Sequence, residues 1–259
     1  MTFVVTGANR GIGFELVRLL VNRNNTHKIV ATCRNAADGD KALEALGRPA
    51  NVEFKLLDIA NDESRAAFAA AMRGTRIDVL VNNAAILCDE ALCEEVARRT
   101  LATNVNGTFE LTTLLLDSCS CERVVMVSSE MGQLKEARFS AAIKKKINAA
   151  TTTAQVLALG DAFVADVAAN TVATAGWREN AYAVSKAILN RLTRVLATEN
   201  PSVFFTATSP NWCRTDMGGS EAPFSATHGA ESILHSVVTP ADELGESGLF
   251  WQDGERLEF

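Results

Sequence analysis

The stretch TFVVTGANRGIG (residues 2–13) places a short apolar run directly before three closely spaced glycines, and it decides the fold class. Gly7, Gly11 and Gly13 leave out side chains where the backbone must turn sharply and approach a ligand. The helical pattern that follows, at 13–23, would begin with unpaired N–H groups and a positive dipole end, which suit a pyrophosphate. The alternative is a tight strand-to-helix turn without a ligand. We favour a dinucleotide site, whose expected contacts in this stretch are Gly7, Asn9, Arg10, Gly11, Ile12 and Gly13.

Strand-like and helix-like patterns alternate along the rest of the chain. The expected strands are residues 2–6, 28–33, 52–58, 78–84, 122–129, 202–210 and 248–251, with helical patterns at 13–23, 38–47, 61–73, 89–118, 181–199 and 226–238. The strands are near-continuous apolar runs, which is typical of a parallel sheet covered by helices on both faces. We therefore expect residues 1–259 to form a single α/β domain. Its fold would be a Rossmann-type doubly wound parallel sheet of about seven strands.

One segment interrupts this alternation, between the strand that ends at Ser129 and the helical pattern that starts at residue 181. A structureless loop of this length is unusual inside a compact domain. Leu159, Phe163 and Val167 recur within it at helical spacing. We expect a helical insertion over residues 133–176, formed by a pair of helices.

Composition and charge exclude several classes of protein. The net charge is −6, so no excess of Lys and Arg is available to face phosphates, and we expect no nucleic-acid partner. No apolar run approaches the ~18 residues of a membrane span, and the start of the chain lacks a signal-peptide pattern. The three histidines are scattered, and the six cysteines have no CxxC spacing. We expect a cytoplasmic protein without a membrane partner or a metal site.

The end of the second predicted strand indicates which dinucleotide binds. NAD sites of this kind carry an acidic residue about 20 residues past the glycine turn, where it accepts a hydrogen bond from the ribose 2′-hydroxyl. Here that place holds Cys33 and Arg34, and Arg10 lies near the same ribose edge. Two guanidiniums without a carboxylate suit a 2′-phosphate, which favours NADP(H) over NAD(H).

The stretch ENAYAVSKAILN (179–190) holds the only tyrosine of the chain. Tyr182 and Lys186 are four residues apart, so they share one face of a helix. A cation beside a phenol favours the phenolate and lowers the pKa of the phenol from its usual value near ~10. The pair is therefore a candidate general acid with a pKa closer to neutrality. The alternative is a half-buried helix tyrosine whose hydroxyl finds a structural partner.

Several motifs in order decide between these alternatives. They are TGANRGIG (6–13), LDI (57–59), NNAA (82–85), Asn104, Ser128-Ser129, YAVSK (182–186) and PNWCRTDM (210–217). Together they resemble the short-chain dehydrogenase/reductase family over nearly the whole chain. Within that family the chain is most similar to the carbonyl reductase subgroup, because of YAVSK, NWCRTDM and the long insertion that precedes residue 181.

The resemblance implies a role for each matching residue. Tyr182 would protonate a carbonyl oxygen as hydride arrives from the nicotinamide, while Lys186 lowers the pKa of Tyr182 and holds the nicotinamide ribose. Ser129 would stabilise the developing negative charge on the oxygen, and Asn104 would carry a proton relay through a bound water. The further contacts implied for the cofactor are Asp58, Ile59, Asn82, Cys213 and Thr215.

The implied activity is NADPH-dependent reduction of a ketone, aldehyde or quinone to an alcohol. A reductase of the same fold with a narrow substrate, such as a pterin or a steroid, is the first alternative, and a dinucleotide sensor without catalysis is the second. The expected substrate pocket consists of Ser129, Trp177, Trp212 and Met217.

The chain departs from the family pattern at three places. Ala85 and Asn211 stand where glycines are usual, and 53 residues separate Ser129 from Tyr182 instead of about a dozen. Asn tolerates a positive φ angle, so the turn at Asn211 should survive. In the family, the Tyr helix and the 89–118 segment usually form the subunit interface. We expect the insertion to cover them and the protein to be a monomer.

Overall fold

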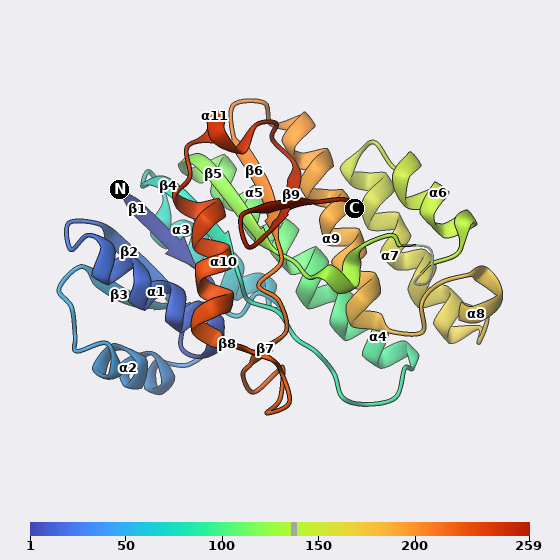
Figure 1. Ribbon diagram of the computed structural model, residues 1–259, viewed down its shortest axis with the longest axis horizontal. Helices are drawn as coiled ribbons and strands as arrows, with labels where there is room; N and C mark the ends of the chain where they lie inside the picture. Colours follow the sequence, from blue (N-terminus) through green and yellow to red (C-terminus); the bar gives the residue numbers. More distant parts are fainter. Residues whose placement is uncertain (136–138) are drawn as a thin grey trace.

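An eight-stranded sheet runs through the centre of the computed structural model, which describes residues 1–135 and 139–259 (Figure 1). Its strands, from one edge to the other, are β10 (Glu255–Leu257), β9 (Leu249–Gln252), β6 (Phe204–Thr208), β5 (Ser120–Val127), β4 (Arg76–Asn82), β1 (Thr2–Val5), β2 (Lys28–Cys33) and β3 (Val52–Leu56). All neighbouring strands are parallel except β9 and β10. The Rossmann-type prediction is therefore confirmed.

The predicted number of about seven strands is wrong within the described residues, because the chain reverses after β9. Asp253 and Gly254 have φ angles of 51° and 79°. Two successive positive φ angles are typical of a two-residue hairpin turn, which pairs β10 with β9. A separate two-stranded ribbon joins β7 (Cys213–Arg214) and β8 (Phe224–Ser225).

The strand order places the functional segments at one edge of the sheet. From β1 the chain moves first toward β2 and β3 on one side, and then to β4, β5 and β6 on the other. In open α/β sheets, ligands bind outside the carboxyl ends of the strands at such a reversal. The glycine turn follows β1, the NNAA segment follows β4 and Ser129 follows β5. Parallel pairing therefore gathers the three segments together.

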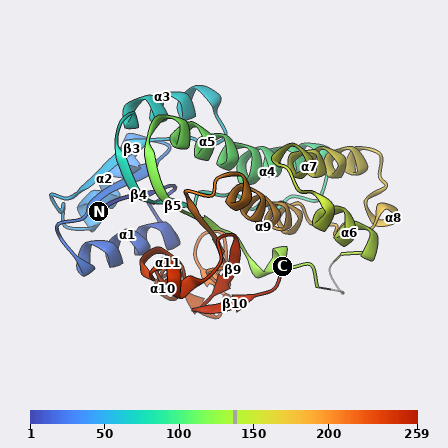
Figure 2. The same ribbon diagram turned by 90° about the horizontal axis from the view of Figure 1, so that it is seen from above.

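Helices cover both faces of the sheet (Figure 2). One face packs against α1 (Gly11–Arg23), α2 (Ala36–Ala45) and α10 (Ala226–Val238), and the other against α3 (Asp62–Met72), α5 (Thr108–Ser118) and α9 (Ala181–Glu199). A short helix, α11 (Ala241–Leu244), precedes β9. Phe3 and Val5 belong to one buried cluster and Val4 to the other, so β1 is buried on both faces. None of the helices in residues 1–135 and 139–259 is long and apolar enough to cross a membrane.

The segment 89–118 is not the continuous helix that its pattern predicts. It forms α4 (Glu94–Leu101), a π-helical stretch η1 (Ala102–Gly107) and then α5. Gly107 allows the close approach of the loop after β3, because a Cβ atom there would lie 2.0 Å from the carbonyl oxygen of Ile59. The π-helical stretch contains Asn104, and such bulges often occur at functional sites.

The insertion folds into helices, as predicted, but into three of them among its described residues. They are α6 (Ala141–Ala149), α7 (Thr153–Ala168) and α8 (Val172–Ala175), while residues 136–138 of the predicted range lie outside the description. Leu159, Phe163 and Val167 are all buried. Helix α7 packs against α4 and α9, and the missing side chain of Gly160 leaves room for Leu101 at their contact. The predicted intramolecular cover of these helices is confirmed.

We predict that this cover keeps the protein monomeric. A partner subunit would have to displace α7 and expose its apolar stripe, whereas the intramolecular contact avoids the ~4–15 kcal/mol entropic cost of association. Light scattering at micromolar concentration should give a mass near 27.7 kDa. A mass of about 55 kDa, twice that of one chain, would contradict the prediction.

Candidate active site

Lys186 is a buried cation at the centre of the site. It lies on α9 with 2% of its surface exposed, and its Nζ donates a hydrogen bond to the carbonyl oxygen of Val127 at 2.8 Å. The same Nζ lies 5.4 Å from the ring centroid of Tyr182. Burial disfavours the charged ammonium and lowers the pKa of Lys186 to about 7.

Tyr182 is the neighbouring phenol, and its pKa moves in the direction opposite to the prediction. It is half-buried by surface area, because part of the residue faces a pocket, yet surrounding protein raises its pKa to about 12. A hydrogen bond with Ser129 acts the other way without overcoming this effect. Lys186 contacts the ring face and donates to Val127, so it offsets little of the cost of burying a phenolate.

Ser129 is placed by a tight turn at the carboxyl end of β5. Its side chain accepts a hydrogen bond from the backbone N–H of Met131 at 3.1 Å and caps the short helix η2 (Glu130–Gly132). Gly132 lets this turn lie directly on α9, because a Cβ atom there would be 2.5 Å from the backbone of Lys186. The turn therefore holds Ser129 beside Tyr182, as the resemblance implied.

Asn104 connects three parts of the site through its side chain. Its Oδ1 accepts from the N–H of Ile86 at 2.8 Å, and its Nδ2 donates to the carbonyl of Ile86 at 2.9 Å and to Ser185 at 3.1 Å. It thereby joins η1 to the loop after β4 and to α9. The amide acts here as a positioning group, and the expected part of Asn104 in a proton relay stays a prediction.

The glycine turn has the geometry of an anion site. Gly7 and Gly11 have φ angles of 62° and 58°, which side chains disfavour. Helix α1 starts without a side-chain cap on its first N–H groups, whereas α9 is capped by Asn180. These free N–H groups are available to a pyrophosphate.

Asn83 holds this turn, and the sequence analysis did not select it. Its Nδ2 donates to the carbonyls of Thr6 and Gly7 at 2.9 and 3.1 Å, and the Thr6 hydroxyl accepts from the N–H of Asn83 at 2.9 Å. By contrast, Asn82 is buried and donates to Thr112 at 2.9 Å. The side chain of Asn82 is therefore directed into the core, and its expected contact with the cofactor stays a prediction.

The other predicted cofactor residues lie in two segments, one directly after β3 and one at β7. Asp58 accepts a hydrogen bond from the N–H of Ala60 at 3.0 Å, which shapes the loop after β3, and the side chain of Ile59 is buried. Thr215 approaches the glycine turn closely, since a Cβ atom on Gly11 would lie 3.4 Å from its methyl group. Cys213 is buried just before it.

The two arginines expected at the ribose have different surroundings. Arg10 is exposed and forms an ion pair with Asp216, which lies next to Thr215. Arg34 is exposed at the end of β2, and within the described ranges it has no ion pair. Asn9 lies in the turn between β1 and α1, whereas Ile12 lies in the first turn of α1 and packs toward Gly229 of α10.

A pocket beside Tyr182 differs from the predicted one. It encloses about 320 Å³ including its mouth, and its walls come mainly from the loop after β4 and from α4. Leu87, Cys88, Leu92, Val96, Thr100 and Tyr182 are among the residues that line it. The sequence analysis missed the segment 86–92, although its position directly after NNAA was an available signal.

None of the three large side chains predicted for this pocket lines it. Trp177 is buried against Phe163 inside the insertion, and its indole N–H donates to Asp166 at 2.8 Å. Trp212 is 54% exposed and is turned toward the carbonyl of Gly218, while Met217 is 41% exposed. Trp177 was expected in the substrate pocket, but its indole completes the core of the insertion.

Comparisons with known proteins agree with this arrangement. A family model described as short chain dehydrogenase matches residues 1–176. The chain belongs to the short-chain dehydrogenase family. It is 34% identical over 270 residues to carbonyl reductase [NADPH] 1 of Sus scrofa, covering 99% of this chain and 93% of that protein. It is 31% identical to salutaridine reductase of Papaver somniferum over 99% of this chain and 95% of that protein. The solved structure of salutaridine reductase superposes with a TM-score of 0.84 at 28% identity, over 96% and 99% of the two chains.

The departures from the family pattern are accommodated locally. Asn211 adopts a φ angle of 67°, so the prediction that asparagine tolerates this turn is confirmed. Its Nδ2 also donates to the carboxylate of Asp253 at 2.9 Å, which ties the loop to the hairpin between β9 and β10. Ala84, and not Ala85, is the residue that packs on Gly7.

The buried ammonium predicts how stability depends on pH. Folded Lys186 has a pKa of about 7 and an unfolded value of 10.5, so between these values the unfolded chain binds more protons and the free energy of unfolding rises with pH. Lys186→Met should therefore stabilise the ligand-free protein most near pH 6, and this gain should shrink toward pH 9, by at most ~1.4 kcal/mol per pH unit.

Urea unfolding of both proteins across this range measures the difference. Lys145→Met, which removes an exposed cation of α6, is the matched control and should show a difference that does not depend on pH. A Lys186→Met difference that is equally flat would show that Lys186 is not desolvated.

Proposed function

We propose that this protein reduces carbonyl compounds to alcohols with NADPH. Tyr182 next to Ser129 at the mouth of a pocket is the observation that carries the proposal. The name of its Sus scrofa relative, carbonyl reductase [NADPH] 1, supports the same reaction. NADPH would supply a hydride to the carbonyl carbon, and the phenol of Tyr182 would supply the proton to the carbonyl oxygen. The products are then an alcohol, the oxidised nucleotide and a tyrosinate that regains its proton from solvent.

The residues present fit this cofactor. The uncapped start of α1, with Gly7 and Gly11 in left-handed conformations, would hold the pyrophosphate. Arg34, exposed without an ion pair in the described ranges, would meet the 2′-phosphate, and no acid at the end of β2 opposes it. Arg10 would reach the same phosphate after releasing Asp216. Lys186 would hold the nicotinamide ribose.

The raised pKa of Tyr182 suits a proton donor. With a pKa near 12 the phenol is protonated at every physiological pH. The alkoxide that forms during reduction is a stronger base than a phenolate, so the proton transfer runs downhill. In the reverse reaction a base is needed, and a phenol that resists ionisation provides little of it. The burial of Tyr182 therefore keeps the phenol in its protonated, proton-donating form.

Ser129 and Lys186 would complete the site from either side of the phenol. Ser129 is close enough to affect the pKa of Tyr182, so a carbonyl oxygen placed between them would accept from both hydroxyls. Lys186 is held by Val127 and keeps a polar group below the ring.

The pocket favours apolar carbonyl compounds. Leu87, Leu92 and Val96 form apolar walls beside Tyr182. Glu179 is also among the lining residues and disfavours anionic substrates, whereas the charge of the lining residue Glu90 is offset by an ion pair with Arg99. Aromatic ketones and quinones match these apolar walls.

We predict that Tyr182→Phe nearly abolishes turnover while NADPH still binds. The substitution removes the proton donor and keeps the ring, and general acids of this kind contribute ~10²–10⁴-fold. NADPH oxidation with menadione or an aromatic ketone measures turnover, and nucleotide fluorescence measures binding. If the variant kept more than about a tenth of the activity, the phenol would supply less than ~1.4 kcal/mol and would not be the donor.

Cofactor choice gives a separate prediction. Arg34→Asp should lower the ratio of kcat/KM for NADPH to that for NADH by roughly 10–100-fold, because a charge-assisted contact of ~1.5–3 kcal/mol is lost. Lys41→Asp makes the same change in charge on the exposed face of α2 and should leave this ratio nearly unchanged. Equal ratios in wild type and Arg34→Asp would show that Arg34 does not contact the 2′-phosphate.

A further inference from the structure

An ion pair between Arg10 and Asp216 joins the glycine turn to the loop after β7. Nη1 of Arg10 lies 2.5 Å from Oδ2 of Asp216, although 206 positions of the sequence separate the two residues. Thr215 precedes Asp216 and lies against the turn, because a Cβ atom on Gly11 would be 3.4 Å from its methyl group. The ion pair is therefore at the edge of the predicted cofactor site. No step of the proposed reaction uses Asp216.

A tight turn holds Asp216 within reach of Arg10. The N–H of Gly218 donates to both the hydroxyl and the carbonyl oxygen of Thr215 at 3.1 Å. Gly218 has no room for a side chain, since a Cβ atom there would lie 2.0 Å from the carbonyl oxygen of Cys213. The backbone around Asp216 is thus fixed, and its carboxylate is a standing partner for the guanidinium.

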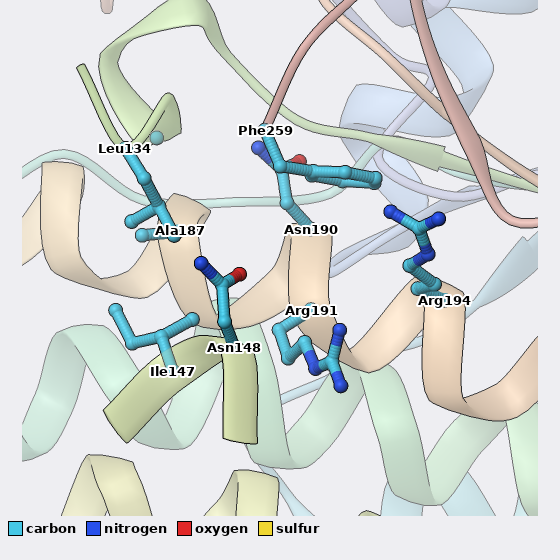
Figure 3. Close-up of a pocket in the computed structure, with 9 residues that line it drawn as sticks. Leu134, Ile147, Asn148, Ala187, Asn190, Arg191, Arg194 and Phe259 are labelled. Carbon is cyan, nitrogen blue, oxygen red and sulfur yellow. The ribbon is translucent and has the colours of Figure 1, made fainter. Parts of the chain in front are cut away.

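The ion pair occupies a guanidinium that is expected to meet the 2′-phosphate. In the part of the chain that the structure describes, Asp216 is the one hydrogen-bond partner of the Arg10 side chain, and Arg34 has no ion pair. Arg191 and Arg194 line a different cavity, beside Phe259 on α9, which contains none of the predicted cofactor residues (Figure 3). Of the two arginines at the predicted ribose edge, one is free and the other is already bound to a carboxylate.

The phosphate and the carboxylate would compete for Arg10. The side chains of Arg10 and Asp216 are 64% and 72% exposed, so water and salt screen their attraction and the pair can open. A phosphate monoester carries more than one negative charge and a carboxylate carries one, so the phosphate would displace Asp216. The displaced carboxylate would still lie near the phosphate and oppose it. NADH has a hydroxyl group in place of this phosphate and leaves the ion pair intact.

We propose that Asp216 is a specificity-determining residue, which competes with the 2′-phosphate of NADPH for Arg10 and so lowers the preference for NADPH over NADH. The inference rests on the proposed function, because it takes Arg10 as a contact of the 2′-phosphate. It gives opposite effects to the two members of one ion pair: Arg10 raises the affinity for a 2′-phosphate, and Asp216 lowers it. A residue that only stabilised the loop would affect nucleotides with and without this phosphate alike.

Two fragments of the cofactor, 2′,5′-ADP and 5′-AMP, test the proposal because they differ only in the 2′-phosphate. Calorimetric titration of the full chain at low ionic strength measures both affinities. Asp216→Asn should tighten binding of 2′,5′-ADP by roughly 2–5-fold and leave that of 5′-AMP unchanged, and the gain should shrink at high salt. Glu221→Gln is the matched control. It removes the same charge from an exposed position of the same loop, where Ser220 donates to it, and should change neither affinity.

A second background shows whether Asp216 acts through Arg10. Arg10→Gln should weaken binding of 2′,5′-ADP on the order of 10-fold, because a charge-assisted contact is lost. In that background Asp216→Asn should add nothing, since no cation is left to be released. Unchanged or weaker binding of 2′,5′-ADP by Asp216→Asn, or an equal gain in both backgrounds, would overturn the role of Asp216 alone. A wild-type protein that bound neither fragment nor NADPH would contradict the proposed function, and the role of Asp216 with it.

Discussion

Burial of α9 is the constraint on which the rest of the structure depends. Fourteen of its nineteen residues are buried, so this helix must be covered on nearly every side. The sheet covers one side through β5 and β6, and α4 and α7 cover another. The insertion therefore belongs to the core, because without α7 the helix would expose an apolar face that a second subunit would have to cover. The same burial surrounds Tyr182 and Lys186 with protein.

A low-dielectric surrounding favours the neutral forms of both titrating groups over an ion pair between them. It disfavours the phenolate of Tyr182 and the ammonium of Lys186 alike, so one pKa rises to about 12 and the other falls to about 7. The result is a protonated phenol held by Ser129, above an amine that is anchored on Val127. This state keeps a proton on Tyr182, which connects the packing of one helix to the proton donor of the proposed chemistry.

The sequence predicts those features that depend on local pattern. Continuous apolar strands indicated the parallel sheet, and the spacing of Leu159, Phe163 and Val167 indicated the face that covers α9. Features that depend on which way a side chain turns were not predictable. Asn82 and not Asn83 was expected at the cofactor, although alternation along β4 directs Asn82 into the core. The spacing of Tyr182 and Lys186 was right, yet the sign of the pKa shift depends on burial that spacing does not report.

Titration of the phenol itself tests the central claim most directly, because Tyr182 is the only tyrosine in the chain. Phenolate absorbance in the ultraviolet then reports one residue, and stopped-flow pH jumps record it before alkaline unfolding. The account predicts that the folded, ligand-free protein shows no phenolate until well above pH ~10, with a midpoint near 12, and that the urea-unfolded chain titrates near ~10. A folded-state midpoint at or below that of the unfolded chain would contradict it, since burial would then not control the proton on Tyr182.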